Sequence, residues 1–494
     1  MNNTMIKPVI HTALAVAVAA LSACGTVGPD FKTPQHVENA AYRHAPASHA
    51  ADAARQPADW WTVFSDQTLN TLERRALLDN PSVRAAAQRL VQAQTQLDVV
   101  RAGQLPSVNA QAGISNSRTS AEAAQGIALG HRSIKGNNYA VGVEFSWELD
   151  LWGRVRRVVE AADAQALATQ DDRDGVLLML SSQVATTYWQ LRGLDAELAI
   201  LRNALATRRE SQELIEARFN AGLSNELDVS RTRIERANAE ADLHEAQRQR
   251  NTFEHALAVL AGASPSAPMV MASQDAALQE EALPEPPSIP VGLPASLLGQ
   301  RPDLASSVAN LQAFNAQIGI AQGAFYPTLS LTGNYGYASE NLRNLTQGSA
   351  RQFSFGPLAL SLPIFDAGRN RANLKLTQAR YEEAVANHEG RLLTALREVE
   401  DALSDVQQRR QQGDVQAQAR QAAARALLVA QARYDRGVST YLEVTDAQRS
   451  TLSADRAAAQ IRTQRLLAAV SLGRALGGGW TQREPAATIT KAGD

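Results

Sequence analysis

Few side chains in this chain have the type and spacing that catalysis or metal binding requires. The eight His residues are scattered, and His44 and His49 are five residues apart rather than the four of a zinc-binding HExxH helix. The single Cys excludes a disulfide framework and a cysteine zinc site. No P-loop or GxGxxG motif occurs, and no motif nominates a Ser/His/Asp set, although the sequence leaves one open. We therefore expect no catalytic residues, no metal site and no bound cofactor.

The one residue with evident chemistry is Cys24, whose thiol follows an export signal. Lys7 supplies a positive charge, and the apolar run from Ala13 to Leu21 is too short to span a bilayer. Residues 1–23 are therefore expected to be a signal peptide. The four residues that end in Cys24 read LSAC and resemble the bacterial lipobox, which implies N-acyl and diacylglycerol lipid on that cysteine. The alternative is a buried structural cysteine.

The composition favours long helices and argues against a nucleic-acid binder. The 494 residues are 45% hydrophobic and 20% charged, and 48 basic residues nearly balance 50 acidic ones for a formal net charge of −2. A nucleic-acid-binding protein would carry a basic excess or stripe. Much of the apolar fraction is Ala, and the rest of the chain is rich in Gln, Arg, Glu and Leu, which form helices readily.

The chain contains one structural unit twice. An offset of 215 residues aligns two turn motifs and several glycines, and an offset of 221 aligns two prolines upstream of them. The matches are Ala217–Ser224 with Ala432–Ser439, Leu227–Val229 with Leu442–Val444, Gly153 with Gly368, Gly262 with Gly477, Pro81 with Pro302 and Pro106 with Pro327. We expect a lipidated segment over 24–65, a first repeat over 66–262, a Pro-rich linker over 263–294, a second repeat over 295–480 and a tail over 481–494.

Each repeat is expected to hold a helix, a β-hairpin, a very long helix, a Gly-centred turn and a return helix. The long helices, about 153–218 and 368–434, carry apolar residues in steps of three and four, which is typical of a coiled coil. Roughly 66 residues at ~1.5 Å each extend about 100 Å, several times a domain diameter. Such helices must run along a fibre, a coiled coil or a tube. The other helices are expected at about 66–103, 225–261, 303–323 and 440–476.

Four segments of about ten residues have the length of transmembrane β-strands. They lie at about 106–116, 139–149, 327–337 and 353–363, and from Tyr139 to Leu149 every second residue is apolar. The fourth is less regular, because Phe353 and Phe355 alternate out of phase with the leucines that follow. Gly356-Pro357 between the two sets predicts a bulge that switches the phase.

Four strands cannot close a barrel, and open sheet edges are not tolerated in lipid. We therefore expect the chain to oligomerise. The connections at about 116–138 and 339–352 are rich in Gly, Ser and Asn and would face outside the cell. The alternative is a small soluble sheet packed on a helix.

Together these features resemble the TolC family of outer-membrane efflux proteins, in particular its OprM- and NodT-like lipoprotein branch. The resemblance covers about residues 18–480. It rests on the duplicated unit, the two membrane hairpins and three local motifs, which are Cys24–Phe31, Trp60-Trp61 with Phe64 and Leu69, and Arg301–Leu304. Gly25 after the cysteine, where Asp would resemble an inner-membrane retention signal, favours sorting to the outer membrane.

The resemblance implies a mainly α fold with a transmembrane β-barrel part. A homotrimer would close a 12-stranded barrel with four strands from each chain, above an α-helical tunnel across the periplasm. The implied function is passive export of drugs or other small molecules, with a periplasmic adaptor (membrane fusion) protein and an RND- or MFS-type inner-membrane transporter as partners. The implied location is the outer membrane, lipid-anchored and membrane-spanning, without nucleic-acid binding. The alternatives are the exit duct of a type I protein secretion system, a periplasmic coiled-coil adaptor and a lipoprotein enzyme acting on cell-wall glycan.

The two hairpin tips, about 219–228 and 434–443, are the candidate sites of interaction. A helix that ends in a tight turn commonly needs a residue at positive φ, which predicts this conformation for Gly222 and Gly437. The resemblance implies that an adaptor docks on these glycines and on the two residues after each, namely Leu223, Ser224, Val438 and Ser439.

Charged residues just beyond the tips are the candidate periplasmic gate. Glu443 and Asp446 are three apart and share a helix face, and the repeat places Asp228 and Arg231 at the equivalent positions. The resemblance implies acidic rings here in a trimer, with Arg231 as partner of one acid in the closed state. The alternative is a solvated helix face.

Overall fold

The computed structural model describes residues 26–33, 42–44, 59–269, 283–289 and 299–481. The expected signal peptide, Cys24 and the tail after residue 481 lie outside the described residues. The helices are α2 (Gln67–Asp79), α3 (Pro81–Ala102), α4 (Ala124–Ala128), α5 (Arg154–Asn220), α6 (Glu226–Leu260), α7 (Pro302–Gly323), α8 (Arg369–Asp435) and α9 (Tyr441–Ala475), with short 3₁₀ turns η1 (Trp60–Phe64), η4 (Leu342–Asn344) and η5 (Gly348–Ala350). The strands are β1 (Ser107–Arg118), β2 (Lys135–Leu149), β3 (Thr328–Ser339) and β4 (Arg351–Ser361).

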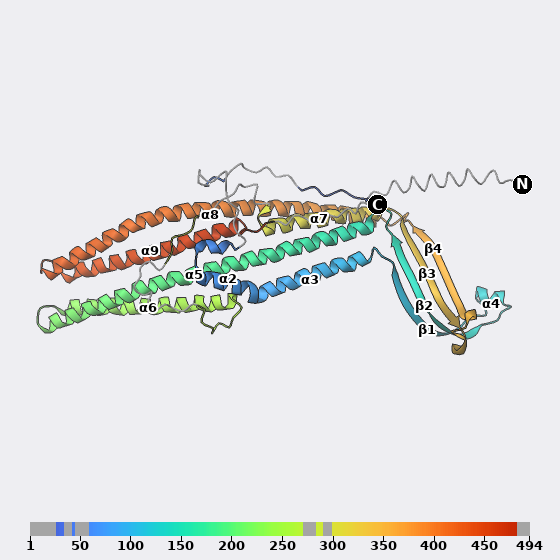
Figure 1. The fold of residues 1–494 in the computed structure, drawn as a ribbon, viewed down its shortest axis with the longest axis horizontal. Helices are drawn as coiled ribbons and strands as arrows, with labels where there is room; N and C mark the ends of the chain where they lie inside the picture. Colours follow the sequence, from blue (N-terminus) through green and yellow to red (C-terminus); the bar gives the residue numbers. More distant parts are fainter. Residues whose placement is uncertain (1–25, 34–41, 45–58, 270–282, 290–298, 482–494) are drawn as a thin grey trace. The chain divides into compact units, whose positions relative to one another are not determined.

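The chain divides into two compact units. The strand unit contains Leu90–Thr169 and Ser307–Asn387, and the tip unit contains Gln35–Arg89, Gln170–Ser306 and His388–Asp494. In Figure 1, α5 and α6 form one helical hairpin and α8 and α9 form another. The helices α5 and α8 are each 67 residues long, and α6 and α9 are each 35 residues long, so the duplication extends to the lengths of the elements.

The helix expected at about 66–103 is instead two helices, which is a correction to the sequence interpretation. Pro81 opens α3 at the first helical position, where its missing N–H costs nothing. Asn80 joins the two helices, and its side chain accepts a hydrogen bond from the backbone N–H of Ser82 (2.7 Å) and donates to the carbonyl of Leu260 (2.8 Å). The hydrogen bond to Leu260, the last residue of α6, thus holds Asn80 in place between the two helices.

The four strands form one antiparallel sheet in the order β1-β2-β3-β4. Residues opposite one another share a face, and the apolar ones line up, as in the row Ala112, Val141, Tyr337. The expected bulge is confirmed: the register shifts between Leu331 and Gly333. Through this shift both apolar sets of β4 lie on the same face, with Phe353 opposite Tyr335 and Leu358 opposite Leu331.

β2 begins at Lys135, four residues before the expected start at 139. The added residues Gly136–Asn138 lack apolar alternation, yet they pair in register with Asn116 and its neighbours on β1. Backbone pairing therefore extends the hairpin beyond its apolar part.

An aromatic core holds the tip unit together where α2, α5 and η1 meet. Trp60, Phe64 and Trp189 are almost fully buried, and the rings of Phe64 and Trp189 lie 5.5 Å apart. The Trp60 indole N–H donates to the Ser181 hydroxyl at 3.0 Å, and the Tyr188 hydroxyl donates to Asp66 at 2.7 Å. The Trp60-Trp61 motif is therefore a packing motif.

The second family-like motif, Arg301 to Leu304, is an anchor for α7. The Arg301 guanidinium donates to both oxygens of Asp303 (3.0 and 2.7 Å), to Glu398 on α8 (2.9 Å) and to the carbonyl of Ala475 at the end of α9 (3.0 Å). Burial of this arginine is tolerable because two carboxylates and a carbonyl replace its hydration.

A buried acid on α2 is the exception in this core. Glu73 is fully buried, and neither carboxyl oxygen makes a hydrogen bond of ordinary geometry within the described residues, although the backbone of Ala185 lies close. Burial disfavours the charged form and raises the pKa of Glu73 to about 9. The carboxyl is therefore neutral at physiological pH.

We predict that Glu73→Gln weakens the pH dependence of stability. The pKa of Glu73 is about 9 in the folded chain against 4.5 for a free side chain. The folded state then holds a proton that the unfolded chain releases, so stability is full below about pH 4.5 and falls by about 1.4 kcal/mol per pH unit as the pH rises toward 9. Thermal unfolding between pH 5 and 8.5 measures this slope.

The matched control is Asp79→Asn, which removes an exposed acid from the same helix. It should leave the slope as it is in the native protein. An unchanged slope in the Glu73→Gln variant would show that the carboxyl is already ionised in the folded chain.

Candidate functional site

Both hairpin tips end in the same glycine cap. Gly222 and Gly437 each have φ of +72°, as predicted. At the first tip the N–H of Gly222 donates to Phe219 O (2.9 Å) and that of Leu223 to Arg218 O (2.8 Å). The second tip repeats both bonds, from Gly437 and from the residue after it. These two hydrogen bonds close the last turn of each long helix. They require the left-handed conformation, which glycine adopts without strain.

A small apolar core ties the two tips to each other within the tip unit. Its buried members come from all four helices of the two hairpins and are Ile215, Val229, Ala430, Tyr441 and Val444. Tyr434 packs edge-on against Tyr441 with ring centres 5.5 Å apart, and the Arg218 guanidinium lies 4.8 Å above the Tyr434 ring. The two hairpins are thus joined at their ends.

Outside this core, each tip exposes apolar side chains. Leu223 is 77% exposed and Val438, at the equivalent position, is 64% exposed. Leu227 and Leu442 form a second equivalent exposed pair. Of the predicted serines, Ser224 is half-buried, and the Ser439 hydroxyl is buried without a hydrogen bond among the described residues. Each tip therefore exposes two apolar side chains at equivalent positions.

Within one chain, each predicted gate residue lies close to an oppositely charged side chain. Arg231 lies 3.6 Å from Asp228 on its own helix, so within the chain its partner is neither Glu443 nor Asp446. Glu443 lies 3.5 Å from Arg433, and Asp446 lies 3.8 Å from Arg449. The four predicted residues therefore belong to separate local pairs within one chain, and each acid has a cation close by.

A buried carboxylate between the hairpins was missed by the sequence reasoning. Glu235 on α6 is 9% exposed and lies 3.2 Å from the Arg208 guanidinium of α5, which is also buried. Its second partner is Arg449 on α9, whose Nε donates to it at 2.9 Å. This hydrogen bond and the negative charge of Glu235 raise the pKa of Arg449. Glu235 follows Asp228 by seven residues, two helical turns along one face, which is the signal that could have nominated it.

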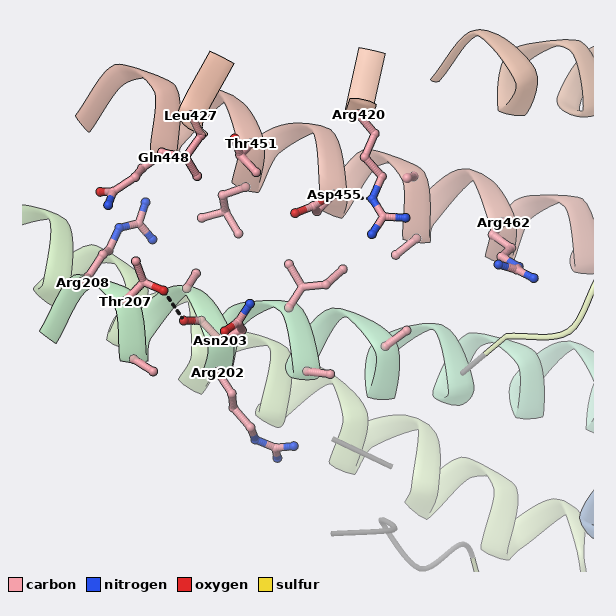
Figure 2. A pocket seen from close by; sticks show the side chains of 18 of the residues that line it. Arg202, Asn203, Thr207, Arg208, Arg420, Leu427, Gln448, Thr451, Asp455 and Arg462 are labelled. Carbon is pink, nitrogen blue, oxygen red and sulfur yellow. Dashed lines mark hydrogen bonds and ion pairs between the residues drawn. The ribbon is translucent and has the colours of Figure 1, made fainter. Parts of the chain in front are cut away.

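Beyond this carboxylate, a cavity of about 700 Å³ separates α5 from α8 and α9. Figure 2 shows Arg208 and Thr207 from α5 on one side and Gln448, Thr451 and Asp455 from α9 on the other. Much of the α5 wall is alanine, so few large side chains bridge the gap. An ion pair crosses the gap, with Arg456 of α9 contacting Glu197 of α5 at 2.7 Å, whereas Arg420 of α8 contacts Asp455 of α9 within one hairpin at 2.8 Å.

The segment just after Cys24 is built into the strand unit. The Val27 N–H donates to the carbonyl of Trp152 at 3.0 Å, three residues past the end of β2. Arg157 of α5 donates to the carbonyls of Val27 (3.1 Å) and Gly28 (3.2 Å) and pairs with Asp30 at 3.1 Å. Gly28 has φ of +107°, and a Cβ there would overlap the backbone of Gly319. Cys24 itself lies outside the described residues.

Two further observations concern metal binding and membrane-spanning helices. Within the described part of the chain, no group of three His, Cys, Asp or Glu side chains is arranged to hold a metal ion. Among the same residues, no helix combines the length and hydrophobicity that crossing a bilayer requires.

Known proteins share this sequence and this fold over almost the whole chain. The family model described as outer membrane efflux protein matches residues 72–263 and 293–478. Outer membrane protein OprJ of Pseudomonas aeruginosa is 35% identical over 483 residues, which is 97% of this chain and 98% of OprJ. Cation efflux system protein CusC of Escherichia coli is 32% identical over 94% of this chain and 97% of its own length.

Among solved structures, the outer-membrane channel OprN superimposes with a TM-score of 0.83 at 31% identity. The match covers 92% of this chain and 100% of OprN. The family match, the relatives and the fold agree with the resemblance inferred from the sequence. The chain therefore belongs to the outer membrane efflux protein family, whose members are channels of the outer membrane.

Proposed function

We propose that this chain is the exit conduit of a tripartite efflux system and passes small molecules passively to the outside. The observation that carries the proposal is the four-stranded sheet, which has one apolar face and two unpaired edges. Three copies would join these edges into one 12-stranded barrel, and their helical hairpins would form a shared tunnel. The homotrimer and its partners, a periplasmic adaptor and an RND- or MFS-type transporter, are part of this proposal.

The channel itself does no chemical work in this scheme, so its role is conducting rather than catalytic. A pump in the inner membrane loads the tunnel, and solutes then move down their gradient. The relative CusC is named for cation efflux, whereas OprJ is named for its location in the outer membrane. We propose drugs or similar small solutes as cargo. A type I protein secretion duct is the alternative, and no feature of the described residues favours it.

We also propose that Cys24 carries the N-acyl and diacylglycerol lipid. Thr26, two residues later, lies against Gly153, just beyond the membrane strand β2. Thr26 thus places the start of this described segment beside that end of the sheet. This is the end from which the helices leave, where the inner leaflet of the outer membrane would lie. Several acyl chains there give a firm anchor, since one chain alone binds weakly.

We predict that Cys24→Ser abolishes lipidation but leaves the sheet able to insert. Removing the thiol removes the only acylation site, whereas the apolar strands are untouched. Cells fed a palmitate analogue should label the native protein and not the variant, and outer-membrane fractionation should find both. Label retained on the serine variant would show that Cys24 is not the lipidated residue.

The tips are the surfaces that a periplasmic adaptor can reach in this proposal. Equivalent exposed residues, Leu223 and Val438, follow the two caps, so a trimer would present six similar apolar turns. The shared tip core holds these turns in a fixed arrangement. An adaptor with apolar side chains at its own end would bury both surfaces.

We predict that Leu223→Asp with Val438→Asp abolishes drug resistance while trimers remain in the membrane. The side chains are exposed, so folding should tolerate the change, whereas a buried charge at the docking surface costs several kcal/mol. Resistance is measured in a host that supplies only adaptor and pump, and assembly by heat-modifiable migration on a gel.

The control is Leu78→Asp, because Leu78 on α2 is 76% exposed and distant in sequence from both tips. It should keep full resistance. Resistance that survives the double tip change, with no adaptor cross-link at the tips, would refute tip docking and with it the tripartite role.

We propose that the charged residues past the tips form the gate. In a trimer Glu443 and Asp446 would recur around the axis, and carboxylates ~7 Å apart repel by about 0.6 kcal/mol in water and roughly 2.4 kcal/mol at an effective dielectric of 20. Arg449 holds α9 to Glu235, but Arg449 is half exposed. If α9 moved and Arg449 lost its contact with Glu235, the Glu235 carboxylate would still be paired with Arg208. The movement of α9 would therefore leave no buried charge without a partner.

We predict that Glu443→Ala with Asp446→Ala lowers the cation-to-anion permeability ratio several-fold in planar bilayers. Both side chains are exposed, and their removal takes away the negative charge that attracts cations at the constriction. Glu245→Ala, an exposed acid far along α6, serves as control and should keep the native ratio. Native selectivity in the double variant would place the selective constriction elsewhere.

A further inference from the structure

The charged residues of the four strands are sorted between the two faces of the sheet. Lys135 and Glu144 on β2 illustrate this, because an odd number of positions separates them and they point to opposite faces. The cations of the strands are Arg118, Lys135 and Arg351, and the acids are Glu144 and Glu148. All three cations share the face of the apolar residues, and both acids share the polar face with Asn109 and Asn334.

The cations on β1 and β2 continue the apolar face toward the hairpin loop. Along this face the cross-strand pairs run from Val108 with Phe145, through two pairs of Ala with Val, to Ile114 with Tyr139. The next pair is Asn116 with Asn137, whose side chains hydrogen-bond at 2.6 Å. The last pair is Arg118 with Lys135. From Val108 toward Arg118, the side chains on this face are therefore first apolar, then include a tyrosine, then are amides and finally are cations.

The spacing places the cationic pair at the border of the hydrocarbon layer. Arg118 follows Val108 by ten positions, which at about 3.4 Å each and a tilt of about 40° rise about 26 Å along the membrane normal. The apolar band of such barrels is about 25 Å tall. With Val108 at the inner border, Arg118 and Lys135 reach the headgroups of the outer leaflet.

Nothing in the described part of the chain neutralises this pair. Arg118 donates only to the Ser133 hydroxyl, at 3.2 Å, and no described acid forms an ion pair with it or with Lys135. The loop acid Glu122 faces His131, and the Glu340 carboxylate lies beside Gly136, on the opposite face. Two cations directly opposite on neighbouring strands repel, so an anion between them would stabilise the hairpin.

We propose that Arg118 and Lys135 bind the phosphate groups of a phosphorylated glycolipid, lipid A, in the outer leaflet. A guanidinium and an ammonium at one level offer several charge-assisted hydrogen bonds to a phosphate. The apolar residues below them would contact the acyl chains of the same lipid. Arg351, on this face at the start of β4, would extend the cationic belt to the second hairpin.

The test is native mass spectrometry of the purified full-length protein with bisphosphorylated lipid A. The native protein should retain the lipid, and Arg118→Ser with Lys135→Ser should need at least tenfold more lipid for equal occupancy. Lipid A without phosphates should bind both proteins equally weakly. Arg132→Ser, which removes an exposed loop cation from the same hairpin, should bind like the native protein.

Equal retention by the native protein and the double variant would overturn the proposal. So would equal displacement by phosphatidylglycerol, which would mean a general attraction for anionic lipid. If the double variant does not assemble, Lys135→Ser alone is compared with Lys135→Arg, and only the arginine variant should retain the lipid. The assay reads lipid binding, so its outcome is independent of conduction and adaptor docking.

Discussion

The hydrogen bonds that a four-stranded sheet cannot make by itself are the constraint on which the rest of this structure depends. β1 and β4 are the two edges, and each presents backbone N–H and C=O groups without a partner strand among the described residues. Water satisfies such groups, but hydrocarbon does not, and each unsatisfied group costs several kcal/mol. The sheet can therefore persist in a membrane only when other copies pair with its edges. The number of copies then also sets how many helical hairpins surround the channel axis.

Duplication supplies the scaffold, and the differences between the copies supply the contacts that join them. The cap glycines Gly222 and Gly437 are equivalent and have the same φ. The position equivalent to Arg449 is Ile234, and the position equivalent to Glu235 is Ser450. The ion pair between α6 and α9 thus exists only because the copies have diverged. Identical hairpins would have had the same shape without this link.

The sequence predicted those features that depend on neighbours along the chain. Positive φ at Gly222, alternation along β2 and the bulge at Gly356 all follow from a few consecutive residues and were confirmed. The helix break at Asn80 was missed although Pro81, which opens the next helix, is a local signal for it, and a contact with distant Leu260 adds to the break. The pairs Arg231 with Asp228 and Asp446 with Arg449 each join residues three apart on one helix, so their spacing can be read from the sequence. The contact of Arg449 with Glu235 was not predictable, because it joins α9 to α6 and depends on how the helices pack.

The strand unit and the tip unit are stabilised by different kinds of interaction. Backbone hydrogen bonds in lipid have no competitor, so the paired strands form a rigid wall. Between α5 and α9 lies the cavity, whose α5 side is largely alanine, and pairs such as Arg456 with Glu197 remain in reach of water. Exposed ion pairs contribute about 0–1 kcal/mol each, because water replaces a lost partner at low cost. These ion pairs therefore add little to the stability of the contact between the hairpins, whereas the glycine caps close each turn and the small apolar core around Tyr441 joins the two tips.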